Sequence, residues 1–251
     1  MSTKGTKEWA GKNINISYGC SNNCKYCYAR RMAIRFGRIQ NKDEWKIMTP
    51  NKKAIEKNYK KTSKRIMFPT SHDITLENID DCIIVLKKLL ETGNNILIVT
   101  KANFEVMDKL YGEVFAKEDC TPKQQYKNQV EFRITITTIN NKLEKEWEPN
   151  APPFWYQRFN VLCLLYGLGY KTSVSIEPFL DKDPIPLIEI VEPYCNTIWL
   201  GIMSGMNYEY HSRENLLKIL ENLKNIPENI RNKIRLKDAY VNKLGLKTNR
   251  L

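Results

Sequence analysis

The most informative segment of the chain is Cys20-Ser21-Asn22-Asn23-Cys24-Lys25-Tyr26-Cys27, which places three thiols at C-x3-C-x2-C spacing. The alternation of Ile14-Asn15-Ile16-Ser17-Tyr18 before it predicts a strand, and residues 29–36 after it predict a helix that ends at Gly37. A loop of this kind can bind three corners of a cubane iron–sulfur cluster and leave the fourth iron without a protein ligand. We therefore expect a strand, a metal-binding loop and a helix in succession.

A structural zinc site is the alternative interpretation of these three thiols. Zinc is usually held by a second pair of Cys or His ligands, as in C-x2-C…C-x2-C. The other cysteines of the chain are scattered singly, and histidine is scarce. These cysteines are Cys82, Cys120, Cys163 and Cys195. The spacing therefore favours an iron–sulfur cluster over zinc.

Length and composition indicate the class of protein. With 251 residues, of which 42% are apolar, the chain can bury a large core as one domain. It has neither an apolar run of about 18 residues nor a charged-then-apolar leader, so we expect no membrane span, no secretion signal and a cytoplasmic location. Seven cysteines, an odd number, fit a reducing compartment in which thiolates bind metal instead of pairing as disulfides.

A formal charge of +12 makes the chain strongly basic. Basic residues are concentrated between Lys52 and Arg65. Such a concentration is the electrostatic footprint of a protein that binds nucleic acid. The alternative is that the charge reflects a composition rich in Lys, Asn and Ile throughout the chain and has no partner.

Strand and helix patterns alternate along the chain. Strands are expected over 14–18, 65–68, 96–100, 130–137, 172–176 and 197–202, and helices over 29–36, 79–90, 104–114, 155–166, 185–191 and 213–223. Six such units predict an α/β fold with a parallel sheet and helices outside, as in a partial (β/α)6 TIM-like barrel. Residues 13–225 would form this barrel, residues 1–12 a loose basic N-terminal arm, and residues 226–251 a C-terminal segment that closes the barrel.

The cysteine spacing, with aromatic Tyr26 just before the last cysteine, resembles the signature of the radical S-adenosylmethionine (radical SAM) superfamily. The resemblance implies a 4Fe-4S cluster on Cys20, Cys24 and Cys27, whose open iron is chelated by the amino and carboxylate groups of S-adenosylmethionine. One electron, from a flavodoxin- or ferredoxin-type donor, would then enter the sulfonium and release a 5'-deoxyadenosyl radical. That radical would abstract hydrogen from a substrate.

Polar side chains follow several of the expected strands, at the end of the barrel where active sites lie. S-adenosylmethionine is a zwitterion with a ribose and an adenine, so it needs a carboxylate partner, acceptors for an ammonium, and hydroxyl or amide contacts. Ser71, Asp73, Lys101, Thr135 and Glu177 supply these types. Lys101 follows four apolar residues, so its cation needs a buried partner, and we favour a ligand in that role.

Longer stretches resemble the spore photoproduct lyase branch of the superfamily. They are Thr70-Ser71-His72-Asp73-Ile74, Val99-Thr100-Lys101, Phe132-Arg133-Ile134-Thr135-Ile136-Thr137-Thr138, and Glu148-Pro149-Asn150-Ala151-Pro152 leading to Arg158. This resemblance implies that Ser71 contacts the ammonium region of S-adenosylmethionine, that Lys101 and Thr135 hold its carboxylate, and that the Tyr26 backbone lies beside the adenine. We interpret Glu148 and Arg158 as a structural ion pair, and His72 as a filler at a strand end.

One position departs from the lyases. They carry a hydrogen-donating cysteine just before the Thr-Ser pair that aligns with Thr70-Ser71, where this chain has Pro69. Proline cannot return a hydrogen atom, which argues against the lyase reaction itself. The four cysteines outside the loop are expected away from the site, on helix faces, in an insertion over 117–128, or before the sixth strand. No catalytic residue is assigned.

Three functional hypotheses follow. The leading one is a radical SAM enzyme that cleaves S-adenosylmethionine reductively and acts on DNA, RNA or a nucleotide. The second is a radical SAM enzyme that acts on a peptide or a small metabolite, for which the basic charge is incidental. The third is a non-enzymatic nucleic-acid-binding protein stabilised by a metal, which leaves the six β/α units unexplained.

Overall fold

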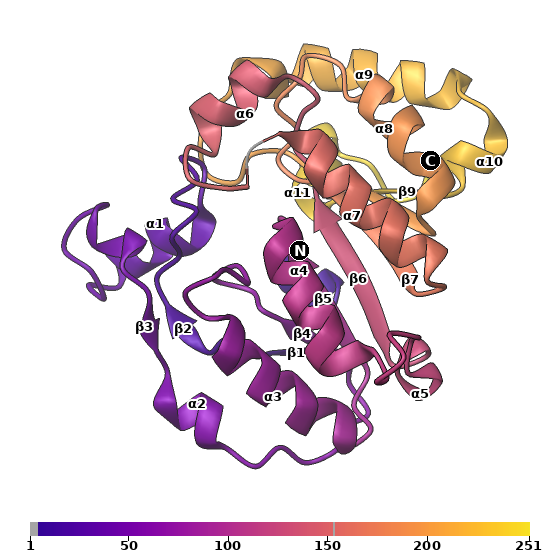
Figure 1. Cartoon of the computed structure of the whole chain (residues 1–251). Helices are drawn as coiled ribbons and strands as arrows, with labels where there is room; N and C mark the ends of the chain where they lie inside the picture. Colours follow the sequence, from indigo (N-terminus) through magenta and orange to yellow (C-terminus); the bar gives the residue numbers. More distant parts are fainter. Residues whose placement is uncertain (1–4, 153) are drawn as a thin grey trace.

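A computed structural model describes residues 5–152 and 154–251 of the chain. Its main element is a parallel sheet of seven strands in the spatial order β1, β4, β5, β6, β7, β8, β9. The sheet curls into a half-barrel with helices around its outer face (Figure 1). The strands are β1 (Lys12–Asn13), β4 (Ile66–Phe68), β5 (Ile96–Thr100), β6 (Val130–Thr135), β7 (Lys171–Ile176), β8 (Thr197–Leu200) and β9 (Ile234–Leu236). The α/β partial barrel expected from the alternating patterns is confirmed.

Helices connect the strands as β/α units. The main ones are α1 (Tyr28–Arg35), α3 (Ile79–Glu91), α4 (Phe104–Leu110), α7 (Trp155–Gly167), α8 (Ile185–Val191), α9 (Arg213–Asn225) and α11 (Asp238–Leu244). Shorter helices are α2 (Lys52–Glu56), α5 (Gln124–Lys127), α6 (Asn141–Trp147) and α10 (Glu228–Arg231). None of the helices in the described ranges has the length and apolarity that a membrane span needs.

The first expected strand, 14–18, does not form as one element. Residues 12–13 join the sheet as β1, whereas β2 (Ser17–Tyr18) pairs antiparallel with β3 (Thr49–Pro50) in a separate ribbon. The reason is that His72 Nε2 accepts hydrogen bonds from the backbone N–H groups of Ile16 (3.1 Å) and Ser17 (3.2 Å). Backbone groups that bind a side chain cannot also pair with a neighbouring strand.

A seventh parallel strand, β9, was not expected. It lies in the C-terminal segment and pairs with β8 through Ile234–Leu236. The six expected strands therefore become seven, with β1 at one edge of the sheet and β9 at the other. The run of three residues is too short for its alternation to be recognised in a segment rich in Lys and Asn.

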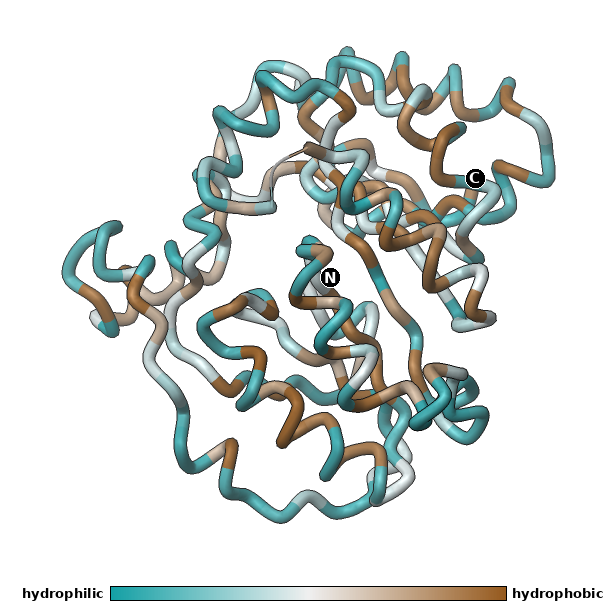
Figure 2. Tube along the Cα trace, in the orientation of Figure 1, coloured by the Kyte–Doolittle hydropathy of each residue, from teal (hydrophilic) through white to brown (hydrophobic). Residues whose placement is uncertain are grey.

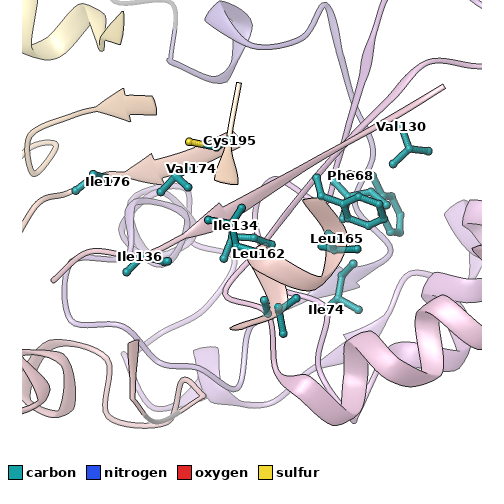
Figure 3. Close-up of a cluster of buried hydrophobic side chains, with 14 of the residues drawn as sticks. Phe68, Ile74, Val130, Ile134, Ile136, Leu162, Leu165, Val174, Ile176 and Cys195 are labelled. Atoms are coloured by element: carbon teal, nitrogen blue, oxygen red, sulfur yellow. The ribbon is translucent and has the colours of Figure 1, made fainter. Parts of the chain in front are cut away.

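The two faces of β6 point into different buried regions of the protein. Val130 and Ile134 belong to the main hydrophobic core between the sheet and the helices, where Leu162 of α7 also packs (Figure 3). The alternate residues Glu131 and Arg133 are also buried, but they point into the half-barrel. The outside of the sheet is thus apolar, while its inside carries charge.

Two of the scattered cysteines lie in the main core. Cys82 of α3 is fully buried, and Cys195 is buried just before β8 (Figure 3). Cys163 on α7 is partly buried, and Cys120 is exposed in the inserted stretch. None of these four lines the cavity described below.

The inside of the half-barrel holds a second, smaller hydrophobic cluster, which consists of Trp9, Ala10, Met67, Leu97 and Trp199. The rings of Trp9 and Trp199 meet edge to face with centroids 5.8 Å apart. The guanidinium of Arg133 lies 4.5 Å from the centre of the Trp9 ring, within the range of a cation–π contact. Trp9 therefore fills the inside of the half-barrel.

The expectation of a loose N-terminal arm is wrong for residues 5–12. Gly5–Glu8 form a 3₁₀ turn, and Lys237 Nζ lies 2.9 Å from Glu8 Oε1, with both side chains about 5–6% exposed. Lys237 follows β9, whereas residues 5–9 lead into β1, so this ion pair ties the two edges of the sheet together. Residues 1–4 of the expected arm lie outside the described residues.

The basic run between Lys52 and Arg65 forms α2 and the connection that enters β4. Figure 2 shows this connection as almost wholly hydrophilic, and most of its residues are exposed. Because it enters β4 from the N-terminal side, it lies at the end of the sheet opposite to the C-terminal strand ends. The densest charge of the sequence is therefore remote from the site.

Candidate functional site

A cavity of about 540 Å³ opens at the C-terminal ends of the strands. Its lining includes all nine residues that the sequence selected as metal- or cofactor-binding. These are Cys20, Cys24, Tyr26, Cys27, Ser71, Asp73, Lys101, Thr135 and Glu177. The cysteine loop precedes α1, and the others follow or end β4, β5, β6 and β7. The parallel order of the strands brings these residues together from distant parts of the chain.

The cysteine loop rests on the segment between α1 and β3, to which the sequence analysis gave no role. Cys20 N donates a hydrogen bond of 2.8 Å to the carbonyl of Trp45, whose buried ring packs with Cys20 and Ala33. Gly19, at φ +83°, lies so close that a Cβ would stand 2.2 Å from the carbonyl oxygen of Ile47. Only glycine fits this approach, because it lacks a Cβ and accepts a positive φ.

A buried arginine organises the loop from the other side. Arg30 of α1 donates hydrogen bonds to Asn23 Oδ1 (2.6 Å) and to the carbonyl of Lys25 (2.9 Å). Cys27 is the N-cap of α1, and its Sγ accepts a hydrogen bond of 3.4 Å from Arg30 N. The backbone between the second and third cysteines is thus fixed by the helix that follows it.

The three thiols are unpaired, and burial opposes the ionisation of two of them. Burial raises the pKa of Cys20 to about 12 and raises that of Cys24 further, although the nearby Lys101 cation lowers the latter in part. A cysteine must lose its proton to bind a metal. The positive charge of bound iron is therefore what would make these thiolates stable in the cavity.

The donor set at the cavity consists of three thiols without a free fourth Cys or His. Among the described residues that line the cavity, the only further Cys or His is His72. His72 is already engaged, because its Nε2 accepts two backbone N–H groups and its Nδ1 donates to the carbonyl of Asp73 at 2.9 Å. A four-coordinate zinc site would need a further ligand. Within the described ranges, no three His, Cys, Asp or Glu residues stand close enough for one metal ion.

Asp73 connects the cysteine loop to the sheet. Its Oδ2 accepts hydrogen bonds from Asn22 Nδ2 (2.7 Å) and from Lys101 N (3.0 Å), and its Oδ1 accepts one from Ile74 N (2.8 Å). Three partners leave this carboxylate little capacity for a ligand, although it lines the cavity. The expected ligand-binding residue therefore acts, in this geometry, as the link between the loop and β5.

Lys101 has a buried protein partner, Glu148, whereas the sequence favoured a ligand as its partner. Its Nζ lies 3.5 Å from Glu148 Oε1 and 5.5 Å from the centre of the Tyr26 ring. The Lys101 side chain is 10% exposed and Glu148 is fully enclosed. Burial alone would lower the pKa of Lys101, but the Glu148 carboxylate, together with Cys24 and Asp73, raises that pKa above its ordinary value. Lys101 is therefore a cation that faces the cavity.

Glu148 is the centre of a buried ionic network. Arg158 Nη1 lies 2.6 Å from Glu148 Oε2, which confirms the expected ion pair, and Tyr26 Oη and Thr137 Oγ1 donate to Oε1. Burial would raise the pKa of Glu148, but Arg158 and Lys101 lower it to about 2. The network joins Tyr26 of the cysteine loop to Lys101 through one carboxylate that does not itself line the cavity.

The loop after β4 is held by an asparagine that the sequence analysis did not single out. Asn15 Oδ1 accepts hydrogen bonds from the backbone N–H groups of Thr70 (2.7 Å) and Ser71 (2.9 Å). Thr135 is at the end of β6, and its carbonyl lies 3.4 Å from Arg158 Nη1. Ser71 and Thr135 therefore belong to segments whose backbones are fixed.

Glu177 stands on the far wall of the cavity, beside Lys237. Its Oε2 is 3.8 Å from Lys237 Nζ, which lies closer to Glu8 Oε1, at 2.9 Å. Burial raises the pKa of Glu177, and the Lys237 cation opposes this only in part. A Cβ at Gly201 would stand 2.7 Å from Glu177 Cγ, so glycine at this position makes room for the carboxylate.

His211 is a structural residue that the sequence left without a role. It is buried, and its Nδ1 accepts a hydrogen bond of 3.0 Å from Met203 N while its Nε2 donates one of 2.9 Å to the carbonyl of Phe179. Burial lowers its pKa to about 4. It holds the loop after β7 against the loop after β8, and both loops line the cavity.

Among solved structures, the chain is similar to SuiB from Streptococcus suis in complex with S-adenosylmethionine. The TM-score is 0.50 at 14% sequence identity, and the match covers 82% of this chain and 42% of the SuiB chain. The chain has the partial barrel fold of radical SAM enzymes. In this radical SAM barrel, the cysteine loop and the strand ends share one cavity. The likeness shows the fold, and the residue roles rest on the geometry above.

Two curated relatives are similar in sequence. The uncharacterised protein ORF301 of Acidianus two-tailed virus is 26% identical over 188 residues, which cover 70% of this chain and 58% of that protein. The uncharacterised protein MJ0683 of Methanocaldococcus jannaschii is 24% identical over 229 residues, which cover 84% of this chain and 79% of that protein. The chain therefore spans less than two thirds of the viral relative and of SuiB. No protein-family model matches the chain.

Proposed function

We propose that this chain is a radical SAM enzyme in which Cys20, Cys24 and Cys27 hold a 4Fe-4S cluster. The observation that carries the proposal is that three unpaired thiols on one loop open onto the same cavity as the polar ends of four parallel strands. When bound, a cluster with S-adenosylmethionine supplies a carbon-centred radical that removes hydrogen from a substrate. SuiB was crystallised with S-adenosylmethionine, and the shared fold supports the same ligand in this chain.

The residues around the cavity suit the polar groups of S-adenosylmethionine. Lys101 is a cation held from behind by Glu148, so its ammonium can pair with the ligand carboxylate, and Thr135 can donate its hydroxyl to the same group. Ser71 would contact the ammonium region, and the backbone at Tyr26 would lie beside the adenine. Asp73 would act by positioning the cysteine loop through Asn22.

For the substrate, we propose a nucleic acid or a nucleotide. The formal charge of +12 favours a polyanionic partner. A peptide or small metabolite is the second candidate, and a metal-stabilised binding module without catalysis is the third. The lyase repair reaction is not proposed, because Pro69 lines the cavity where the lyases carry their cysteine.

The test of the cluster is anaerobic reconstitution with iron and sulfide, followed by measurement of both elements per chain. Cys24→Ala should lose the 4Fe-4S absorbance and most of the bound iron. Cys120→Ala is the matched control, because Cys120 is exposed and far from the cavity, and it should bind iron like the unchanged chain. Zinc at one atom per chain after purification, with no uptake of iron and sulfide, would contradict the proposal.

A further inference from the structure

The exposed face of α1 begins at the opening of the cavity and extends away from it. Tyr28 and Ala29, at the start of α1, line the cavity, and Tyr28 is 57% exposed. Arg35 is seven residues further on, so it lies on the same helix face as Tyr28, about 10 Å along the axis. The opposite face carries the buried residues Arg30 and Ala33. Figure 1 shows α1 and the loop after it at the rim of the half-barrel.

Aromatic and cationic side chains also follow one another at the end of α1. Phe36, the C-cap of α1, is 60% exposed, and the Arg38 guanidinium lies 5.7 Å from its ring centre. Arg35 and Arg38 are both exposed. We call Tyr28, Arg35, Phe36 and Arg38 the α1 platform. Large apolar rings that remain this exposed beside cations are costly to keep in water, and they are typical of surfaces that receive a partner.

The charge around the α1 platform favours a polyanion. Residues 25–46 contain seven Lys and Arg, of which only Arg30 is buried, against Asp43 and Glu44. Asp43 is already paired with Lys46 at 2.7 Å. The remote run between Lys52 and Arg65 lies at the other end of the sheet, so this is the basic surface that adjoins the cavity.

The platform is also fixed relative to the cavity. Arg31 Nη2 donates a hydrogen bond to the carbonyl of Ser204, which lies in the loop after β8 and lines the cavity. The helix is therefore anchored on both sides of the lip, by the cysteine loop that precedes it and by this arginine. A partner bound along α1 would have one end at the opening.

We infer that the α1 platform docks a single-stranded nucleic acid whose bases stack on Tyr28 and Phe36 and whose phosphates contact Arg35 and Arg38. Exposed flat rings between cations are what unpaired bases on a phosphate backbone require, because every base has a face to stack. In a duplex the bases are already stacked on one another and offer no free face. The inference rests on the proposed function. It adds the place at which the nucleic-acid strand approaches the cavity.

The test compares two triple variants of the reconstituted full chain, each of which loses one aromatic ring and two cations. Arg35→Ser/Phe36→Ser/Arg38→Ser removes two cations and one exposed ring from the platform and spares every residue of the cavity. Phe104→Ser/Arg213→Ser/Lys218→Ser removes the same kinds of group from α4 and α9, where Phe104 is 57% exposed. The probes are a fluorescein-labelled 12-mer of mixed-sequence single-stranded DNA, the same sequence as RNA, the DNA duplex, and a poly-glutamate peptide.

We expect the unchanged chain to bind a single strand more tightly than the duplex. The platform variant should bind it about tenfold more weakly, with a log–log salt slope smaller by about 1.4, since two phosphate contacts are lost. The control variant should stay within about twofold of the unchanged chain. Equal loss in both variants, or tighter binding of the peptide than of either strand, would overturn the inference.

The same preparations separate this inference from the proposed function. Cleavage of S-adenosylmethionine without substrate depends on the cysteine loop and Lys101, which the platform variant leaves unchanged. Cleavage at the unchanged rate, with weakened strand binding, supports both statements. Strand binding that depends on the platform in a chain that never cleaves S-adenosylmethionine would contradict the proposed function and leave the docking surface standing.

Discussion

Lys101 Nζ and Glu148 Oε1 lie 3.5 Å apart, with the lysine at the wall of the cavity and the glutamate fully enclosed behind it. The glutamate also receives Arg158 and Tyr26, so one carboxylate connects the cysteine loop, β5 and α7. A cation held in this way is available to a ligand without moving. The geometry of the proposed site and the stability of the fold therefore both depend on Glu148.

We predict that Glu148→Gln destabilises the fold by about 3–5 kcal/mol, because Arg158 and Lys101 would keep their buried charges without a carboxylate. The pKa of Glu148 is about 2 in the fold against an ordinary value of 4.5. Its contribution is therefore complete above about pH 4.5 and is lost as the pH falls toward 2. Urea unfolding from pH 7 to pH 2.5 should show the difference between the two chains shrinking with falling pH.

The control for this prediction is Glu146→Gln. Glu146 forms an exposed ion pair with Lys25 at 3.9 Å, which should contribute less than about 1 kcal/mol. If Glu148→Gln and Glu146→Gln have the same free energy of unfolding at pH 7, the buried network does not stabilise the fold.

We predict that Thr135→Val and Lys101→Met weaken the binding of S-adenosylmethionine to the reconstituted chain. The loss of a hydrogen bond to a charged group corresponds to roughly tenfold to hundredfold in affinity. Equilibrium dialysis measures it, with the iron content reported beside it to show that the cluster is intact. Lys109→Met changes a lysine paired with Asp80 at the surface and is the control. Unchanged affinity in both cavity variants would refute these roles.

Gly19→Ala should disrupt the close contact between the start of the cysteine loop and the segment that supports it. A Cβ would stand 2.2 Å from a backbone carbonyl, and the positive φ alone costs roughly 1–2 kcal/mol. We expect a lower Tm and a loss of at least half of the reconstituted iron. Gly167→Ala, where a Cβ meets no described atom within 4 Å, should keep both. Full iron content in Gly19→Ala would show that the loop can form without this contact.

His211 makes stability depend on pH in mildly acidic solution. Its pKa is about 4 in the fold and 6.5 in its ordinary range, so between these values the unfolded chain takes up a proton that the folded chain does not. The contribution of His211 to the free energy of unfolding is therefore complete above about pH 6.5. It falls, by at most about 3 kcal/mol, as the pH drops toward 4. In His211→Gln this part of the slope should vanish. The same slope in both chains would exclude the assignment.

The sequence predicts which residues line the cavity better than it predicts the contacts that hold those residues in place. Strand order alone placed Ser71, Lys101, Thr135 and Glu177 at one edge of a sheet, and the structure gathers them in one cavity with the cysteines. That success follows from topology, since the carboxyl ends of parallel strands must meet. It required no knowledge of side-chain contacts.

The supports were missed because they depend on single contacts between distant residues. Trp45 lies in a polar segment without periodicity, and nothing local shows that its carbonyl receives Cys20. Glu8 and Lys237 stand near opposite ends of the chain, so no pattern within either segment indicates their ion pair. The first strand was expected over 14–18, whereas β1 covers residues 12–13, because the ring of His72 takes N–H groups that a strand over 14–18 would use.

The most direct test of the central claim is the formation of 5'-deoxyadenosine. The reconstituted chain, reduced with dithionite under anaerobic conditions and given S-adenosylmethionine, should produce this nucleoside in a chromatographic assay, as should Cys120→Ala. Cys24→Ala should produce none. Absence of the nucleoside from an unchanged chain that carries its full iron and sulfide would contradict the claim that this cavity cleaves S-adenosylmethionine.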